Sequence, residues 1–188
     1  METKIITCTI LVIVTIINVH SKSNNLVKFD SVKQEIFLSL EKNKILHSTQ
    51  KERGLSAFYL ATNGSDLVHK ALNQAYTETN TAISQLEIWP SFRQPVHFIS
   101  KISYLETIVR FRYKVEQRIT TLKEIINFYS NDNTILISWL GERISITTIG
   151  VIWKELAAYH MLMISKENIG IERALGTVHY MGGKITFT

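Results

Sequence analysis

The chain of 188 residues contains little cysteine, proline or glycine. Its single cysteine, Cys8, has no internal partner, which excludes a disulfide scaffold, a cysteine-ligated zinc site and a cysteine nucleophile further along the chain. With two prolines and eight glycines, the composition is neither collagen-like nor disordered, and it is poor in turn residues for a many-stranded β-sandwich. These absences favour a fold of long helices.

A strong excess of one charge is also missing. The 21 basic residues exceed the 16 acidic residues by five, and the two kinds alternate along the chain. Because a nucleic-acid-binding protein gathers its basic residues on one surface, we predict no nucleic-acid partner.

Signatures of catalysis and of metal binding are lacking as well. The histidines show no metal-ligand spacing, and the segment around Ser56 lacks the second glycine of a nucleophile elbow. The sequence has no glycine-rich phosphate-binding loop. We therefore predict that the chain is not an enzyme and that it holds no metal and no cofactor.

The first 21 residues have the pattern of a signal peptide. Lys4 precedes an uncharged run over residues 5–19, and small residues lead to a plausible cleavage site after Ser21. This run is shorter than the roughly 20 residues that span a bilayer as a helix, although an uncleaved anchor remains an alternative. Asn63 begins an N-x-S sequon and is predicted to carry an N-linked glycan. We expect a location outside the cell, either secreted or on the extracellular face of the plasma membrane.

Apolar residues at three- and four-residue spacing predict an all-α fold of long helices. Four or five helices are expected. They run from residue 31 to about 61, from 66 to before Trp89, from about 98 past Arg110, from about 121 through Leu140 with a bend near residues 130–133, and from 147–150 to about 181. Thr121 and Glu124 form a capping-box pattern, and both prolines fall between the second and third helices. The expected inner face of the third helix comprises Phe98, Ile102, Leu105, Ile108 and Val109.

Helical periodicity turns several arginines inward. Arg53 and Arg112 lie on apolar stripes, Arg173 lies on a second stripe of the last helix, and Arg143 is a weaker candidate. A guanidinium keeps its charge, so an inward arginine needs an anion or water. One interpretation is an internal ion pair with Glu52, Glu167 or Glu172. The other is a positive pocket for a small anion, since Glu167 is the only carboxylate plainly on an apolar stripe.

The same arginines lie in motifs that resemble those of the nitrate- and nitrite-sensing (NIT) domain. Residues 49–57 (TQKERGLSA) resemble its Q-[KR]-E-R-G-x-[ST] signature, and residues 166–174 (KENIGIERA) resemble its K-E-x-x-G-x-E-R-A signature. Between them, residues 111–116 and 128–130 resemble two shorter family motifs. By position, the resemblance implies that Arg53, Arg112 and Arg173 bind the anion. The secondary candidates are Gln50, Glu52, Arg143 and Glu172.

The resemblance implies an extracellular sensor built from two four-helix bundles, with nitrate, nitrite or another small oxyanion between them. In animals, such a domain is attached to receptor-type guanylate cyclases, which implies a homodimer in the full-length receptor. Residues 26–188 would form this sensor. Because 15 residues follow Arg173, we expect the second bundle to be incomplete and the membrane span and cyclase to be absent. Any membrane attachment would then use the leader or a missing downstream span.

The predicted function is sensory anion binding that signals to an attached output domain, most simply a guanylate cyclase. The alternative is a secreted helical-bundle protein that acts as an interaction partner or as a carrier of apolar molecules. A carrier needs a continuous apolar cavity, and three inward arginines argue against one.

Overall fold

The computed structural model describes residues 26–89, 95–146 and 150–181. These residues form five α-helices and one short 3-10 helix, and no strand occurs among them. In chain order the elements are α2 (Leu26–Ala61), α3 (Asp66–Gln85), η1 (Val96–Phe98), α4 (Lys101–Glu116), α5 (Leu122–Ile146) and α6 (Gly150–Tyr180). The predicted all-α class is confirmed. The predicted signal peptide, residues 1–21, and the expected helix stop at residues 182–183 lie outside the described residues.

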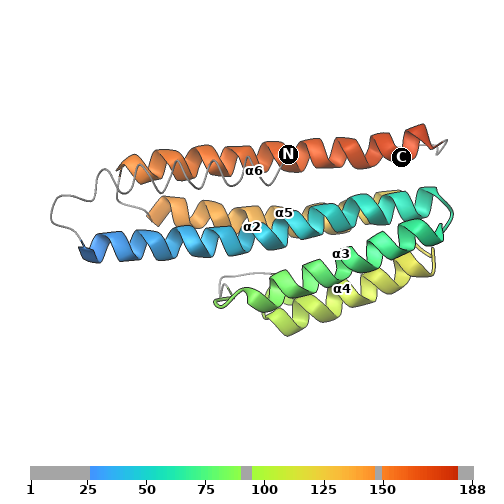
Figure 1. The fold of residues 1–188 in the computed structure, drawn as a ribbon, viewed down its shortest axis with the longest axis horizontal. Helices are drawn as coiled ribbons and strands as arrows, with labels where there is room; N and C mark the ends of the chain where they lie inside the picture. Colours follow the sequence, from blue (N-terminus) through green and yellow to red (C-terminus); the bar gives the residue numbers. More distant parts are fainter. Residues whose placement is uncertain (1–25, 90–94, 147–149, 182–188) are drawn as a thin grey trace.

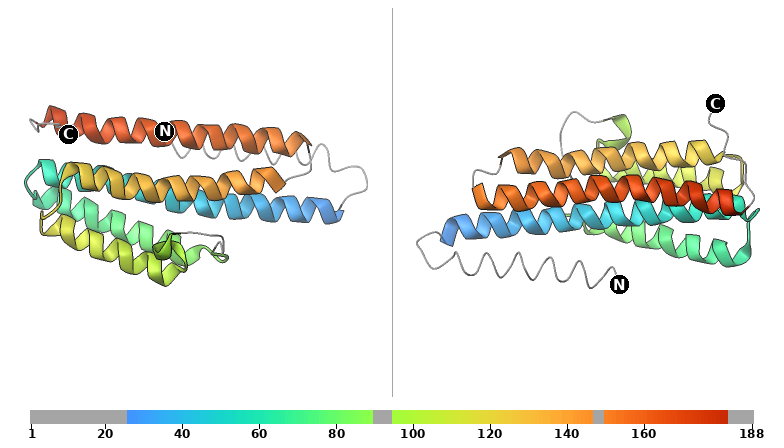
Figure 2. Two further views of the ribbon diagram at one scale, coloured as in Figure 1. Left: turned by 180° about the vertical axis from the view of Figure 1, so that it is seen from behind. Right: turned by 90° about the horizontal axis from the view of Figure 1, so that it is seen from above.

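The helices alternate in direction, so that consecutive helices are antiparallel (Figure 1). Helix α2 contacts α3, α5 and α6, and α5 also contacts α6. Helix α6 covers the face of α2 and α5 that points away from α3 and α4 (Figures 1 and 2). The N-terminal half of α2 and the C-terminal half of α5 extend beyond α3 and α4, where they run beside α6 (Figure 1). Helix α2 is therefore enclosed by neighbours on more than one side.

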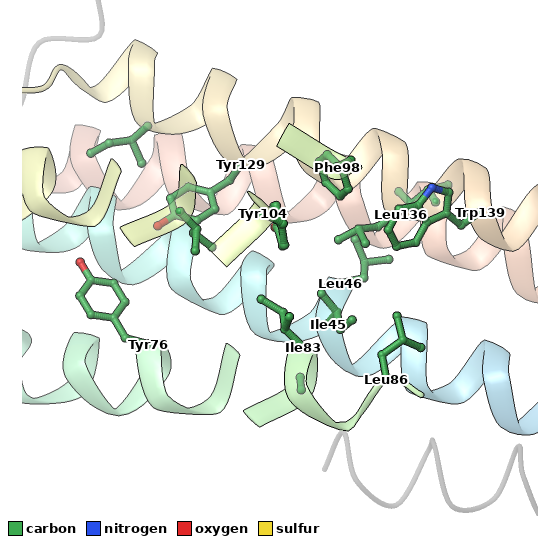
Figure 3. Packing of buried hydrophobic residues seen from close by; sticks show 14 of the residues in the cluster. Ile45, Leu46, Tyr76, Ile83, Leu86, Phe98, Tyr104, Tyr129, Leu136 and Trp139 are labelled. Carbon is green, nitrogen blue, oxygen red and sulfur yellow. The ribbon is translucent and has the colours of Figure 1, made fainter. Parts of the chain in front are cut away.

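The main hydrophobic core lies between α2, α3, α4 and α5 (Figure 3). Its aliphatic part includes Ile45, Leu46 and Ile83, all without solvent exposure. Its aromatic part includes Phe98 of η1 and Trp139 of α5, whose rings lie 5.4 Å apart in an edge-on arrangement. Each fully buried side chain of this size contributes roughly 1.5–3 kcal/mol, so packing of these apolar faces holds the helices together.

Local sequence sets the helix ends around residues 62–66 and 117–122. Helix α2 ends where Asn63 and Gly64 adopt positive φ values of 53° and 86°, a conformation that glycine tolerates and asparagine visits. Helix α4 ends similarly at Arg118, whose Nη1 donates to Asn63 O at 2.7 Å. The predicted capping box is present: Glu124 N donates to Thr121 Oγ1, and Thr121 N donates to Glu124 Oε2.

Several local expectations differ from the structure. Helix α2 already begins at Leu26 rather than at residue 31. Ile102 and Val109, expected on the inner face of α4, are 69% and 53% exposed. The buried face of α4 is formed by Tyr104, Ile108, Arg112 and Val115, and Ile102 lies roughly 120° around the helix from Ile108. Polar Arg112 thus takes part in the buried face, while apolar side chains remain outside.

None of the described helices combines the length and the apolar character needed to cross a membrane.

Candidate functional site

A row of buried polar side chains runs along α2 through the interior of the bundle. Thr49, Glu52, Arg53 and Ser56 follow one another at intervals of one to three residues, and none is exposed to solvent. Charged side chains are almost never fully buried unless they are paired. These positions are buried because α3, α5 and α6 all pack against α2.

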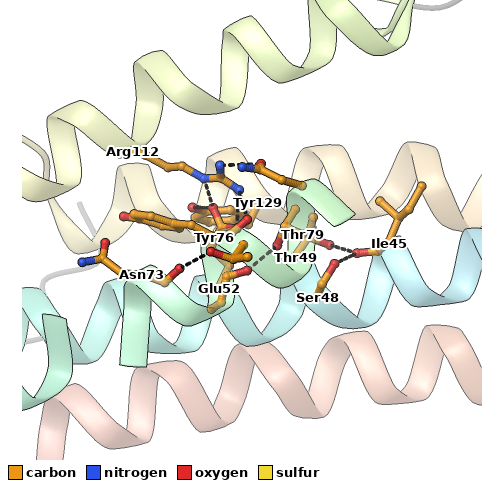
Figure 4. A network of polar contacts seen from close by, with 12 residues as sticks. Ile45, Ser48, Thr49, Glu52, Asn73, Tyr76, Thr79, Arg112 and Tyr129 are labelled. Atoms are coloured by element: carbon orange, nitrogen blue, oxygen red, sulfur yellow. Dashed lines mark hydrogen bonds and ion pairs between the residues drawn. The ribbon is translucent and has the colours of Figure 1, made fainter. Parts of the chain in front are cut away.

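The first buried ion pair joins Arg112 of α4 to Glu52 of α2 (Figure 4). Arg112 Nε and Nη2 each donate to one carboxylate oxygen at 2.8 Å, which is bidentate geometry. Arg112 Nη1 donates to Asn80 Oδ1 at 2.8 Å, and its guanidinium carbon lies 4.5 Å from the centre of the Tyr76 ring. This pair ties α4 to α2 and α3.

Tyr129 of α5 completes this part of the network by donating to Glu52 Oε1 at 2.6 Å. Burial, together with the negative charge of Glu52, raises the pKa of Tyr129 well above its usual value, so the phenol keeps its proton. Burial works against the charge of Arg112, but the hydrogen bond and the charge of Glu52 raise the pKa of Arg112 overall. Glu52 is thus held by donors from two other helices.

The second buried ion pair joins Arg53 of α2 to Glu167 of α6. Arg53 Nη1 donates to Glu167 Oε1 and to Ser130 Oγ, the latter at 2.9 Å. The other carboxylate oxygen, Glu167 Oε2, accepts from Gln50 Nε2 at 2.8 Å and from Asn133 Nδ2 at 3.0 Å. The carboxylate of α6 therefore sits in a set of donors from α2 and α5.

Gly170 permits the close approach of Arg53 to α6. A methyl group at Gly170 would lie 2.7 Å from Arg53 Nη2, which is too short for a non-bonded contact. The same nitrogen lies 3.5 Å from the backbone oxygen of Glu167. The glycine of the K-E-x-x-G motif therefore leaves room for the guanidinium at this depth.

Some hydrogen-bonding capacity in this cluster is unused. Arg53 Nε and Gln50 Oε1 are buried, and neither has a hydrogen-bond partner among the described residues. An unpaired buried donor costs free energy unless another group or molecule satisfies it. Arg53 Nε can thus donate one more hydrogen bond.

The predicted site residues do not all come together. Arg53 and Arg112 are buried, as expected from helical periodicity, but each is paired with a carboxylate. The expectation that Glu167 is the only carboxylate plainly on an apolar stripe is wrong, because Glu41, Glu52 and Asp132 are buried as well. Glu167 balances the charge of Arg53 and Glu52 balances that of Arg112, so the ion-pair interpretation describes these two arginines in this structure.

The prediction that Arg173 faces inward is also wrong, since its side chain is exposed. Helix α6 turns Glu167 toward α2, and a residue six positions later points roughly 120° away. Glu172 is exposed too, and the side chain of Arg143 lies outside the described residues. Their assignment to anion binding stays a prediction.

Other members of the network were not among the predicted site residues. Tyr129 and Ser130 lie in one of the short motifs, and the structure places them against Glu52 and Arg53. Asn80 and Asn133 carry no signal in a single sequence, because each is one polar residue in a helix rich in polar residues. Among the described residues, no group of three or more His, Cys, Asp and Glu side chains could hold a metal ion.

Fold and site together define an all-helical domain whose interior is crossed by arginine–carboxylate pairs. A family model described as "Nitrate and nitrite sensing" matches residues 44–187. Since this match covers more than half of the chain, the chain belongs to the nitrate and nitrite sensing family, as the motifs predicted. Membership indicates a sensory role in nitrate or nitrite recognition. No curated protein and no solved structure matches the chain.

Proposed function

We propose that this chain senses nitrate, nitrite or a similar small oxyanion by binding it at Arg53, where the anion replaces the carboxylate of Glu167. One observation carries the proposal: a carboxylate of α6 occupies a cradle of donors formed by α2 and α5. Those donors are Arg53, Gln50 and Asn133.

The chemistry of this cradle suits a small planar anion. A carboxylate and a nitrate ion are both planar and singly charged, and both present oxygens that a guanidinium and amide groups can contact. The unused Arg53 Nε offers a donor for a further oxygen. A rigid fork of N–H groups fits such an anion better than an ammonium group does.

Displacement of Glu167 would couple binding to a movement of α6. Its side chain connects α6 to Arg53 and Gln50 of α2 and to Asn133 of α5. An anion that takes these donors stabilises the arrangement in which α6 is released from them, and so shifts the population between two states. An attached output domain, by resemblance a guanylate cyclase, would respond to this change.

The other two predicted anion ligands, Arg112 and Arg173, have different roles in this proposal. The donors of Arg112 are occupied by Glu52, Asn80 and the backbone oxygen of Tyr76, so we assign Arg112 to the support of α2. Arg173 is exposed, and its role as a second anion ligand rests on the family motif.

The test is thermal unfolding of the chain in sodium nitrate, nitrite, chloride and sulfate at equal ionic strength. Mass action predicts that the melting temperature rises with the concentration of the sensed anion. Arg53→Lys keeps the charge but loses the guanidinium fork, and it should abolish that rise. Arg110→Lys, the same change at an exposed arginine of α4, should leave it intact. Equal stabilisation of Arg53→Lys and the unaltered chain would contradict this site.

Glu167→Gln tests displacement separately from binding. The amide keeps the shape of the side chain but removes the competing negative charge, so we expect a lower dissociation constant for nitrate or nitrite by titration calorimetry. Weaker binding in Glu167→Gln would mean that the carboxylate is part of the anion site and is not displaced from it.

We also propose that the chain acts outside the cell, as a secreted protein or on the extracellular face of the plasma membrane. The support is the signal-peptide pattern of residues 1–21 and the exposed sequon at Asn63. Enzymatic removal of N-glycans should increase the mobility of the chain from secretory cells, and Asn63→Gln should remove that difference.

A further inference from the structure

Helix α4 carries an ordered row of apolar side chains on its outer face. Ile102, Val109 and Tyr113 are 69%, 53% and 60% exposed. Their spacing of seven and four residues places all three along one stripe of the helix. Singly exposed apolar side chains are normal on protein surfaces, but an aligned row is characteristic of a contact surface.

The opposite face of α4 already accounts for its packing within the chain. Tyr104, Ile108, Arg112 and Val115 form that buried face. Helix α4 lies on the side of the bundle farthest from α6, as both side views show (Figures 1 and 2). The outer stripe therefore lies mostly outside the packing of the described residues.

Two exposed charged residues interrupt and flank the stripe. Glu106 lies between Ile102 and Val109, and Arg110 follows one turn later. Arg110 Nε donates to the backbone oxygen of Glu106 at 3.3 Å, and neither side chain forms an ion pair within the described part of the chain. Both charges remain available to a partner.

We propose that α4 is the contact helix of a symmetric homodimer, in which the α4 helices of two copies pack antiparallel. With the two-fold axis level with Thr107 and Ile108, Ile102 lies opposite the partner subunit's Tyr113. Glu106 lies opposite the partner subunit's Val109 and next to the partner subunit's Arg110. Because a two-fold interface uses the same patch twice, this arrangement forms two Glu106–Arg110 ion pairs.

Charge complementarity indicates that the outer stripe of α4 binds a second copy of this chain. It also favours the antiparallel arrangement of the two helices. In a parallel symmetric pair, Glu106 would face the same residue of its partner across the apolar stripe, and like charges in contact are unfavourable. The antiparallel pair brings opposite charges together without any further partner. In this arrangement the apolar residues of one α4 face those of the other, and the acidic residue of each copy faces the basic residue of the other.

The outer face of α6 provides a matched comparison. Its apolar residues include Ile169, whose exposed fraction of 53% equals that of Val109. Nothing in the structure indicates an occupant for that face. A substitution of Ile169 thus introduces the same charge at an equally exposed apolar position outside the proposed contact.

The experiment is sedimentation velocity of the full chain over a series of protein concentrations, with Val109→Glu and Ile169→Glu as variants. We expect a concentration-dependent dimer for the unaltered chain and for Ile169→Glu. Val109→Glu should raise the dissociation constant by about tenfold or more, because it places like charges beside Glu106. A chain that stays monomeric at every concentration, or a dimer that dissociates in Ile169→Glu but not in Val109→Glu, would overturn the proposal.

A charge swap tests the arrangement. Glu106→Arg and Arg110→Glu should each weaken the dimer, and the double variant should restore it. Failure of the double variant to restore the dimer would exclude the antiparallel pairing. All these positions are exposed, so unchanged helical circular dichroism is expected and separates loss of contact from loss of fold. The outcome does not depend on anion binding at Arg53.

Discussion

At the scale of single residues, the interior of this protein depends on charges that neutralise one another. Glu52 has no exposure to solvent and receives hydrogen bonds from Arg112 and Tyr129. A buried pair adds little net stability compared with apolar residues, since both charges lose their water. Removal of one partner is costly, because the remaining charge stays buried without compensation.

Glu52→Gln should therefore lower the free energy of unfolding by about 3–5 kcal/mol, as measured by urea denaturation. Glu78→Gln is the matched control, because Glu78 pairs with Lys51 at 2.7 Å with both side chains 40% exposed. An exposed pair of this kind contributes at most about 1 kcal/mol. Equal losses in the two variants would show that the Arg112 charge does not need Glu52.

At the scale of elements, close contacts between helices fix the position of each buried group. Helix α6 approaches Arg53 of α2 at Gly170, where even a methyl group would meet Arg53 Nη2 at 2.7 Å. Around Gly176 of the same helix, nothing lies within 4 Å of an added methyl group. The two glycines differ in their surroundings although both lie in α6.

Gly170→Ala and Gly176→Ala should consequently change stability in opposite directions. Alanine in place of an unconstrained helical glycine stabilises by roughly 0.5–1 kcal/mol, which we expect at Gly176. At Gly170 the methyl group forces Arg53 away from Glu167, so we expect a loss of about 1–3 kcal/mol. Urea denaturation measures both, and a stabilising Gly170→Ala would contradict the close approach of the two helices.

The short helix η1 is attached to α5 by a different polar contact. His97 Nε2 lies 3.1 Å from Oδ1 of Asp132, which is 2% exposed. Burial raises the pKa of Asp132 from 3.8 to about 6, and the nearby His97 opposes part of that rise. The folded protein therefore binds a proton more tightly than the unfolded chain does.

From this shift we predict a pH dependence of stability. Protonated Asp132 adds to the free energy of unfolding; this contribution is fully present below pH 3.8 and is lost as the pH rises through about 6. At about 1.4 kcal/mol per pKa unit, the free energy of unfolding changes by about 3 kcal/mol over this range. Asp132→Asn should remove this component from urea denaturation curves measured between pH 4 and 7. Asp66→Asn, at an exposed position, should not. Identical pH profiles for Asp132→Asn and the unaltered chain would disprove the shift.

At the scale of the whole molecule, the fold leaves apolar side chains exposed on the outer faces of α4 and α6. On α4 they form the outer stripe, and on α6 they include Leu162 and Ile169, which are 59% and 53% exposed. The polar cluster around Arg53 lies between these two faces, in the layer formed by α2 and α5. Binding at this cluster involves interior side chains of α2, α5 and α6, whereas association uses the outer face of α4, so the two tests are independent.

Much of this organisation could be predicted from the sequence. Local rules predict the all-α class, the end of α2 near Asn63 and the start of α3 at Asp66. They also predict the capping box and the burial of Arg53 and Arg112. Helical periodicity and turn chemistry act over three or four residues, so they can be recognised in one chain. The family motifs also identified the family, because they are local strings of residues.

The tertiary structure decided which groups neutralise one another. Glu52 and Arg53 are adjacent in sequence, yet they pair with Arg112 of α4 and Glu167 of α6 rather than with each other. The burial of both depends on three helices packing around α2, and the exposure of Arg173 depends on which face of α6 meets α2. Periodicity defines the faces of each helix by itself, but the partner of each face is set by the packing of the whole bundle.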